Sequence, residues 1–137
     1  MKALSVLEPW ASLIMHGKSV ENRSWYMAYR GPLVICASKR IDTQWTQEEW
    51  GHLLWWLGPH KPPTLPDLFS DFPMLHGYAL GLVDVIGCDH HMTNNPWEVA
   101  DQLHIRLANP RPFSKPFPQK GQLGLYEIDD EIVRSAA

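Results

Sequence analysis

The residues best suited to chemistry lie close together, in the segment HGKSVENRSW between His16 and Trp25. Glu21 and Arg23 are two residues apart, so on a β-strand their side chains share one face and can form an ion pair. Lys18 follows Gly17, where a helix is expected to end; a cation there either offsets the helix dipole or contacts an anion. If Lys18 and Glu21 face one cleft, they form a polar pair able to transfer a proton. An exposed surface ion pair is the simpler alternative.

Aromatic and basic residues that could complete a binding site surround this segment. Trp10 and Trp25 flank it, and aromatic rings beside Lys and Arg are how single-stranded bases are held. Trp10 also lies on an apolar stripe, so it could simply pack a helix against the core. Lys39 ends a predicted strand and Lys120 opens another, so both heads are expected at the rim of the sheet, where they could guide a phosphate.

Other chemistries find less support in the sequence. The run from Cys88 to His91, with His76, suggests a metal site. Adjacent His residues rarely share one ion with good geometry, however, and no second Cys/His pair stands at zinc spacing. We therefore expect no metal and no cofactor. No Ser-His-Asp or Cys-His spacing supports a nucleophilic mechanism.

The net charge of −3 hides an uneven distribution. Residues 1–40 contain six Lys or Arg and two Glu, residues 41–101 one Lys and nine acidic residues, and residues 102–127 four Lys or Arg and one Glu. If the two basic parts fold together, they form a local positive surface.

The composition is typical of a folded protein, with 45% hydrophobic and 20% charged residues. The length suits one domain, residues 1–137. Cys36 and Cys88 lie in apolar runs and are expected to be buried free thiols of a reducing compartment. We see no signal peptide and no apolar run of about 18 residues, so we expect a cytoplasmic protein without a membrane segment.

The hydrophobic periodicity predicts short strands with helices between them. Strands are expected at 2–6, 19–25, 33–38, 78–88, 104–113 with a break at Pro110, and 122–129, after which the tail should fray. Helices are expected from Pro9 to Gly17, at 46–57 and at 94–103, the last capped by Asn95 and Glu98. The proline-rich residues 58–73 are expected to form a long irregular connection, either a candidate lid or an inserted loop. This order predicts an α+β protein with a small, strongly bent sheet or barrel.

Five motifs together resemble the ASCH domain (activating signal cointegrator homology), a PUA-like family of mixed β-barrels. They span Leu4 to Ile128 in the family's order: LSVLEPWASLIMHGKSVENRSW, RGPLVICAS, GLVDVIGC, ANPRPF and KGQLGLYEI. The resemblance implies a barrel of five to six strands with flanking helices, and a cleft walled by the first helix and the Gly-Lys…Glu-x-Arg segment. Family members are associated with RNA or nucleic-acid binding. A few are enzymes, an amidohydrolase on acetylated cytidine and a ribonuclease, so enzymatic activity stays open.

The family motif corresponds here to Pro9, Trp10, Gly17, Lys18, Glu21, Arg23, Trp25, Lys120 and Gly121. Two residues depart from the family's pattern. Many members have Gln where this chain has Glu8, and the amidohydrolase type has Thr where this chain has Glu21. The second departure weakens the transfer of hydrolase chemistry.

The leading hypothesis is a cleft that binds RNA or a modified nucleotide, single-stranded nucleic acid included. Lys18, Arg23 and Lys120 would contact phosphates or base edges, Glu21 would accept from a base or orient Arg23, and Trp10 or Trp25 would stack. One alternative is a small hydrolase acting on a nucleoside amide or on RNA, with Lys18 and Glu21 as acid and base. Another is a protein-interaction adaptor that uses residues 58–73.

Overall fold

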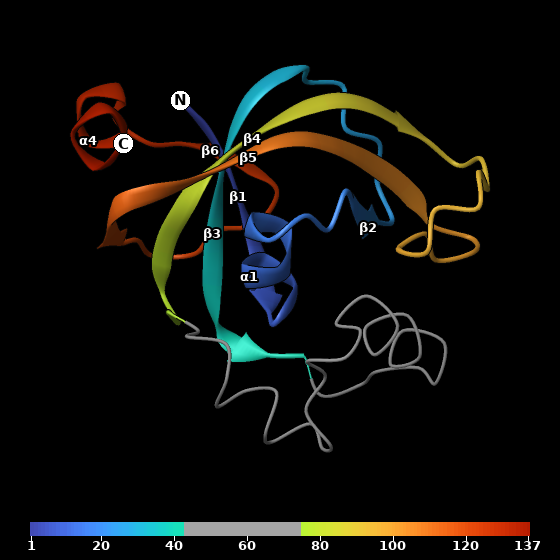
Figure 1. The fold of residues 1–137 in the computed structure, drawn as a ribbon, viewed down its shortest axis with the longest axis horizontal. Helices are drawn as coiled ribbons and strands as arrows, with labels where there is room; N and C mark the ends of the chain where they lie inside the picture. Colours follow the sequence, from blue (N-terminus) through green and yellow to red (C-terminus); the bar gives the residue numbers. More distant parts are fainter. Residues whose placement is uncertain (43–74) are drawn as a thin grey trace.

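The apolar runs of the chain form one mixed sheet in the computed structural model, which describes residues 1–42 and 75–137 (Figure 1). The strands are β1 Lys2–Glu8, β2 Val20–Arg23, β3 Gly31–Ile41, β4 Tyr78–Asp89, β5 Leu103–Pro118 and β6 Leu125–Glu127. The helices within the described residues are α1 Trp10–Met15 and α4 Asp130–Ala136. The predicted helix 46–57 and connection 58–73 lie outside the described residues.

The order of the strands across the sheet is β2-β5-β4-β3-β1-β6. β1 and β3 pair in parallel, and every other neighbouring pair is antiparallel. The sheet is strongly bent, and β4 and β5 arch over α1 (Figure 1). The predicted α+β class and bent sheet are therefore confirmed. A barrel is not, because β2 and β6 lie at the two ends of the order and no hydrogen bonds between described strands close the sheet.

Irregular strand pairing accompanies this bend. The register shifts once between β1 and β3, once between β3 and β4, and three times between β4 and β5. Such shifts arise where one strand has an extra residue, a bulge that increases the local twist of the strand. Gly81 of β4 lets α1 lie close to the sheet. A Cβ at this position would lie 2.5 Å from the backbone oxygen of Arg111 and 2.6 Å from the sulfur of Met15. A larger residue at position 81 would displace the helix or β5.

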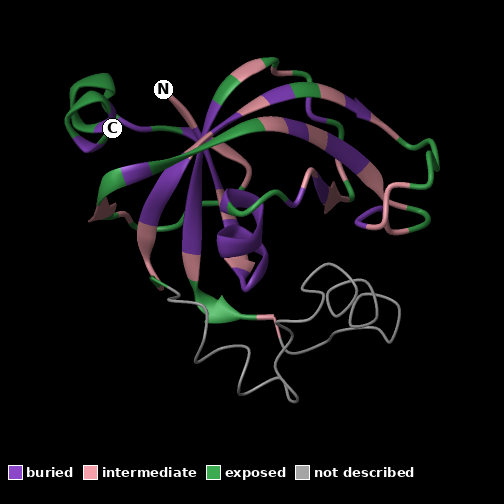
Figure 2. Cartoon of the chain, in the orientation of Figure 1, coloured by how far each residue is buried: buried purple, intermediate pink, exposed green. Residues whose placement is uncertain are grey.

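β3 separates two layers of apolar side chains. Leu33, Ile35 and Ala37 belong to the cluster that also contains α1, and Val34 and Cys36 belong to the cluster that contains α4 residues. This alternation follows from the two-residue period of a strand. Figure 2 shows the result, with buried residues along the middle of the strands and on α1.

The expected break of the fifth strand at Pro110 is wrong, because β5 continues to Pro118. Asp84 of β4 lies opposite Ala108 and Leu82 lies opposite Arg111, so Asn109 and Pro110 form a bulge opposite Val83. Asn109 takes a positive φ of 52° there. Proline is tolerated at a bulge, where its missing N–H breaks no ladder bond.

The tail does not fray, contrary to the prediction. β6 covers only three residues, and α4 follows it. The side chain of Asp129 accepts hydrogen bonds from the backbone N–H groups of Glu131 and Ile132, which caps the helix. Val133 and Ala136 are buried in the second cluster, so tertiary packing stabilises this short helix.

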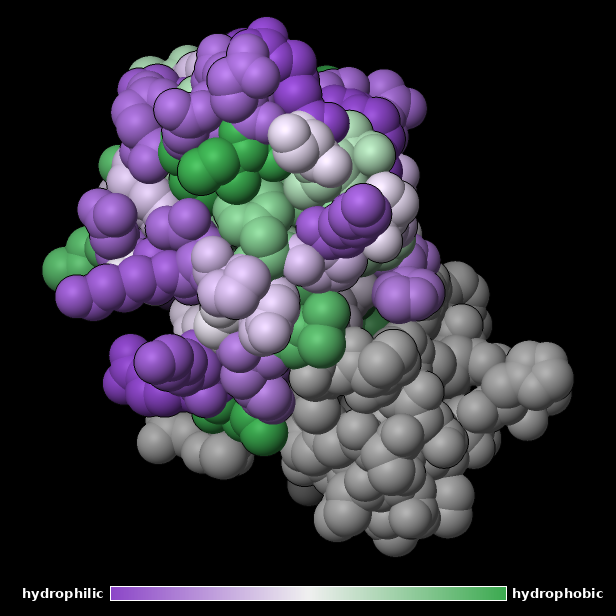
Figure 3. All heavy atoms as spheres, turned by 90° about the vertical axis from the view of Figure 1, so that its left-hand side faces the viewer, coloured by the Kyte–Doolittle hydropathy of each residue, from purple (hydrophilic) through white to green (hydrophobic). Residues whose placement is uncertain are grey.

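Hydrophilic side chains predominate on the face of the described residues shown in Figure 3, and hydrophobic ones lie in small separate patches. Among the residues described, no helix has the length and apolar character needed to cross a bilayer.

Candidate functional site

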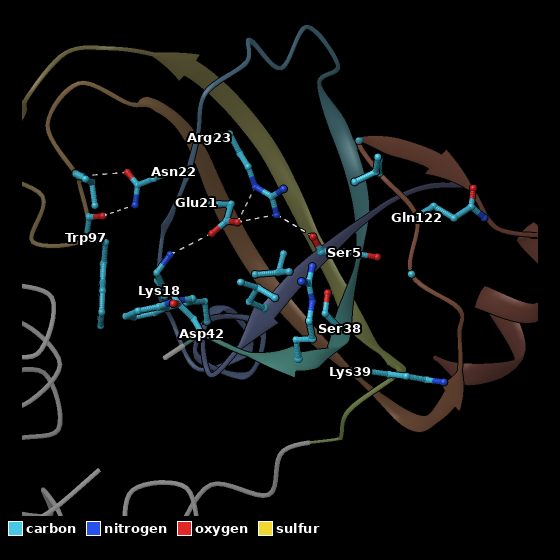
Figure 4. A pocket seen from close by; sticks show the side chains of 18 of the residues that line it. Ser5, Lys18, Glu21, Asn22, Arg23, Ser38, Lys39, Asp42, Trp97 and Gln122 are labelled. Atoms are coloured by element: carbon cyan, nitrogen blue, oxygen red, sulfur yellow. Dashed lines mark hydrogen bonds and ion pairs between the residues drawn. The ribbon is translucent and has the colours of Figure 1, made fainter. Parts of the chain in front are cut away.

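A cavity of about 850 Å³ opens beside α1 and β2, within the size range of small-molecule sites. Its walls come from five parts of the described chain. The lining residues are Ser5, Val6, Leu7, Trp10, Lys18, Glu21, Asn22, Arg23, Ser38, Lys39, Arg40, Asp42, Pro96, Trp97, Glu98, Val99, Ala100, Lys120, Gly121, Gln122, Leu123 and Gly124. Six of the seven candidate site residues therefore meet here. Figure 4 shows most of these side chains around the opening.

One wall of the cavity carries a chain of charges. Lys18 Nζ lies 3.4 Å from Glu21 Oε1 and also donates to the backbone oxygen of Val20. The other carboxylate oxygen, Glu21 Oε2, accepts from Arg23 Nε at 2.9 Å. Lys18 is 4% exposed and Glu21 is 7% exposed. The interpretation of Glu21 and Arg23 as an exposed surface pair is therefore wrong.

Turns of the backbone position the side chains of Lys18, Glu21 and Arg23. α1 ends at Met15, and Gly17 follows with a φ of 115°, a conformation suited to glycine. The N–H of Lys18 then donates to the backbone oxygen of Leu13 at 2.9 Å, which turns the chain into β2. Arg23 Nη2 donates to the oxygen of Ser5 in β1 at 2.8 Å, so the guanidinium is anchored across the cavity. The predicted helix end at Gly17 is confirmed, and Pro9 occupies the N-cap position.

Two tryptophans lie near the lysine. Lys18 Nζ is 5.5 Å from the ring centroid of Trp10 and 6.0 Å from that of Trp97, both within cation–π range. Trp10 Nε1 donates to Asp42 Oδ2 at 2.8 Å. Trp10 also belongs to the apolar cluster, so it both packs α1 and lines the cavity.

The predicted helix at 94–103 is wrong, since residues 94–102 form turns. The capping contacts do form: Asn95 Oδ1 accepts from the N–H of Trp97, and Glu98 Oε1 accepts from the N–H of Asn95. The side chain of Asn22, however, forms hydrogen bonds with the backbone groups that would otherwise continue a helix. Its amide donates to the oxygen of Trp97 at 2.9 Å and accepts from the N–H of Val99 at 3.0 Å.

Arg106 of β5 fixes the same turn from the other side. Its guanidinium contacts Glu98 Oε2 at 2.7 Å and both oxygens of Asp89, at 2.8 and 3.0 Å. Burial alone would raise the pKa of Glu98, but hydrogen bonds from Thr93 and Arg106 outweigh it and lower that pKa to about 2. Hydrogen bonds from Arg106 likewise lower the pKa of Asp89. The turn that carries Trp97 is thus held by ionised carboxylates.

The rim of the cavity is basic. Lys39 and Arg40 are exposed at the end of β3, and Lys120 is exposed after β5. Gly77 connects the backbone segments that carry the two lysines: its N–H donates to the oxygen of Ala37 and its oxygen accepts from the N–H of Gln119, both at 2.9 Å. The sequence placed Lys39 and Lys120 at a strand rim, and the structure places that rim on the cavity.

Trp25 does not line the cavity. β2 ends at Arg23, so strand alternation does not extend to residue 25, and Trp25 packs half-buried against the first apolar cluster. In the suggested metal run, Asp89 binds Arg106, and the rings of His90 and His91 stack on each other. Among residues 1–42 and 75–137, no three His, Cys, Asp or Glu side chains gather as a metal site would require. Cys36 and Cys88 are free and buried, as expected.

Glu8, the departure from the family pattern before Pro9, is fully buried. Its carboxyl oxygens accept from the N–H of Ser12 at 2.8 Å and from the hydroxyl of Ser12 at 2.6 Å. Burial nevertheless raises the pKa of Glu8 above its usual 4.5. The raised pKa brings this side chain closer to the neutral Gln of the family pattern.

Among the site residues that sequence reasoning missed are Asn22, Asp42, Trp97 and Glu98. Asn22 stood on the face opposite Glu21, and Trp97 stood in a predicted helix. One signal was available for Trp97. The pair Pro96-Trp97 repeats the pair Pro9-Trp10, and both tryptophans lie near Lys18.

Known proteins are similar to this chain over most of its length. A family model for the ASCH domain matches residues 4–117. Activating signal cointegrator 1 of Mus musculus is 33% identical over 141 residues, and that of Homo sapiens is 31% identical over 140 residues. Each alignment covers 97% of this chain and 23% of the relative, so the chain spans about a quarter of these curated relatives. Since the family model matches most of its length, the chain belongs to the ASCH domain family.

Proposed function

We propose that the cavity binds a nucleotide of single-stranded RNA, with its base at the end formed by Trp10, Trp97 and Lys18. The observation that carries this proposal is the placement of two indole rings within 6.0 Å of one buried ammonium group, all lining one cavity. Aromatic faces hold unstacked bases, and neighbouring cations strengthen that contact. The known association of the ASCH family with RNA supports the same ligand class.

The polar groups between the rings and the rim suit the edge of a base. Glu21 has acceptor capacity beyond its bonds to Lys18 and Arg23, because each carboxylate oxygen carries two lone pairs. Arg23 uses Nε and Nη2 for Glu21 and Ser5, and its Nη1 has no hydrogen-bond partner among the described residues. An acceptor and a donor therefore lie next to each other on the cavity wall.

Binding of labelled short single-stranded RNA, measured by fluorescence anisotropy, tests the proposal. Trp97→Ala is expected to weaken binding by about 1–3 kcal/mol, the range for one stacked base. Trp25→Ala is the matched control: this tryptophan is also partly buried but lies outside the cavity, so its loss should leave affinity unchanged. Equal affinity of wild type and Trp97→Ala, or no RNA binding at low salt, would contradict the proposal.

A hydrolase acting in the same cavity is the second candidate. It is favoured by one observation: Lys18 and Glu21 are both buried and only 3.4 Å apart, as an acid–base pair would be. Turnover of an acetylated nucleoside or of RNA that disappears in Lys18→Ala and Glu21→Gln would establish it. RNA binding without turnover would instead favour a binding function over a hydrolase. The adaptor hypothesis rests on residues 58–73, which lie outside the described residues.

A further inference from the structure

The two ends of the cavity differ in charge. At the aromatic end, Lys18 and Arg23 stand against the three carboxyl groups of Glu21, Asp42 and Glu98. The remaining charged residues of the lining, Lys39, Arg40 and Lys120, are all cations. Figure 4 shows this separation, with Lys18, Asp42 and Trp97 on one side and Lys39 and Gln122 on the other.

The rim cations form no ion pair with the described residues, whereas six other basic residues do. Lys2, Lys18, Arg23, Arg106, Arg111 and Arg134 each form an ion pair with a carboxylate. Lys39, Arg40 and Lys120 form none with any described residue, although the net charge is −3. Like charges that line one cavity without a carboxylate partner among the described residues repel one another, and an anionic ligand would relieve that repulsion.

The strand ends hold this rim in place. Gly77 adopts a φ of 75°, and a Cβ at this position would lie 3.3 Å from Cγ of Lys39. The stem of Lys39 therefore packs against the glycine, beside the backbone bond that joins Gly77 to Gln119. Gly121, next to Lys120, approaches Ser5 closely, since a Cβ there would lie 3.3 Å from Ser5 Oγ. Both lysines thus extend from constrained backbone.

From this charge separation we infer that Lys39, Arg40 and Lys120 form a phosphate subsite, so that the ligand is a nucleotide bound with its base at the tryptophans and its phosphate at the rim. This inference rests on the proposed function and deepens it. Carboxyl groups disfavour a phosphate at the aromatic end, and the three rim cations attract one. Lys18 is then assigned to the base end, because Glu21 already neutralises it. A free nucleoside would leave the rim cations unpaired.

Calorimetric titration with the four ribonucleosides and their 5′- and 3′-monophosphates tests the inference on the full chain. One of the two monophosphate series is expected to bind about tenfold more tightly than the nucleosides, as a charge-assisted contact implies. The preferred series gives the direction of the RNA chain. The triple variant K39A/R40A/K120A should keep nucleoside affinity and lose the preference for the phosphate.

Charge reversal supplies the matched control. Lys39→Glu and Lys115→Glu change the net charge equally, but Lys115 is exposed on β5 and does not line the cavity. Only Lys39→Glu should abolish the phosphate preference, and thermal melting should show both variants folded. Nucleosides that bind as tightly as their monophosphates, or a preference that survives the triple variant, would overturn the subsite while leaving base binding intact. Failure of nucleosides, monophosphates and single-stranded RNA alike to bind would overturn the proposed function as well.

Discussion

Glu21 lies between the cations Lys18 and Arg23 in a largely buried wall of the cavity. The stability of the fold is therefore sensitive to substitution of Lys18 or Glu21. The side chains of Lys18 and Glu21 are 4% and 9% exposed, so water screens the pair weakly. Loss of one partner leaves a buried charge with fewer contacts, which costs more than the intact pair contributes. Arg23 still contacts Glu21 after loss of the lysine, which limits the cost.

We predict that Lys18→Met destabilises the fold by about 3 kcal/mol, the lower end of the range for breaking a buried ion pair. Urea denaturation followed by circular dichroism measures the free energy of unfolding. The double variant K18M/E21Q should recover part of the loss, because it removes the carboxylate that the single variant leaves behind. A single variant as stable as wild type would show that the pair does not hold this wall.

At the scale of elements, the turn of residues 93–98 is held by charge where a helix was expected. Glu98 accepts from the N–H and hydroxyl of Thr93, each at 2.8 Å, as well as from Asn95 and Arg106. These bonds favour the ionised carboxylate. The position of Trp97 therefore depends on the protonation of Glu98.

We predict a loss of stability in acid that depends on Glu98. Its folded-state pKa of about 2 lies below the usual 4.5, so the ionised form stabilises the fold fully above about pH 4.5. That contribution is lost as the pH falls from 4.5 toward 2. Urea denaturation at a series of acidic pH values should show a smaller decline for Glu98→Gln than for wild type. Part of the decline in stability should remain in Glu98→Gln, because the pKa of Asp89 is also lowered in the folded protein.

The control for this measurement is Glu131→Gln on α4, whose side chain is 80% exposed and forms an ion pair with the exposed Arg134. Its stability should decline in acid as wild type does, because exposed ion pairs contribute little. Identical declines for Glu98→Gln and wild type would contradict the role of Glu98.

At the scale of the whole molecule, the sheet divides the core into two layers. The layer around α1 contains Leu13 and Leu33, and the layer around α4 contains Val133 and Ala136. The cavity lies on the α1 side, because Trp10 and Trp97 belong to that layer. Changes in the α4 layer should therefore affect stability without affecting the cavity.

We predict that core substitutions in the two layers add independently. Leu13→Ala should cost about 2–5 kcal/mol and Val133→Ala about 1–2 kcal/mol, from the apolar volume removed. In the double variant the two losses should sum to within about 0.5 kcal/mol, because the residues belong to separate apolar clusters. Leu13→Ala with Leu33→Ala, both in the α1 layer, is the comparison in which coupling is expected. Strong coupling between Leu13 and Val133 would show one continuous core.

Local patterns predicted much of the fold. Pro9 and Gly17 bracketed α1, and continuous apolar runs marked β3 and β4. The two-residue spacing of Glu21 and Arg23 predicted their contact, which the structure confirms. These features succeed because helix ends, strand periodicity and neighbouring side chains depend on residues close in sequence.

The sequence by itself thus determined where the six strands lie, though not how far β5 and β6 extend, together with the first helix and the polar segment from Lys18 to Arg23. Only the tertiary structure decided which residues join that segment. Asn22 binds the backbone 75 and 77 residues further along the chain, which replaces a helix with a turn and brings Trp97 to Lys18. α4 likewise forms because Val133 and Ala136 find an apolar layer to cover. These outcomes depend on contacts between buried groups that lie far apart in the sequence, and local sequence patterns do not predict such contacts.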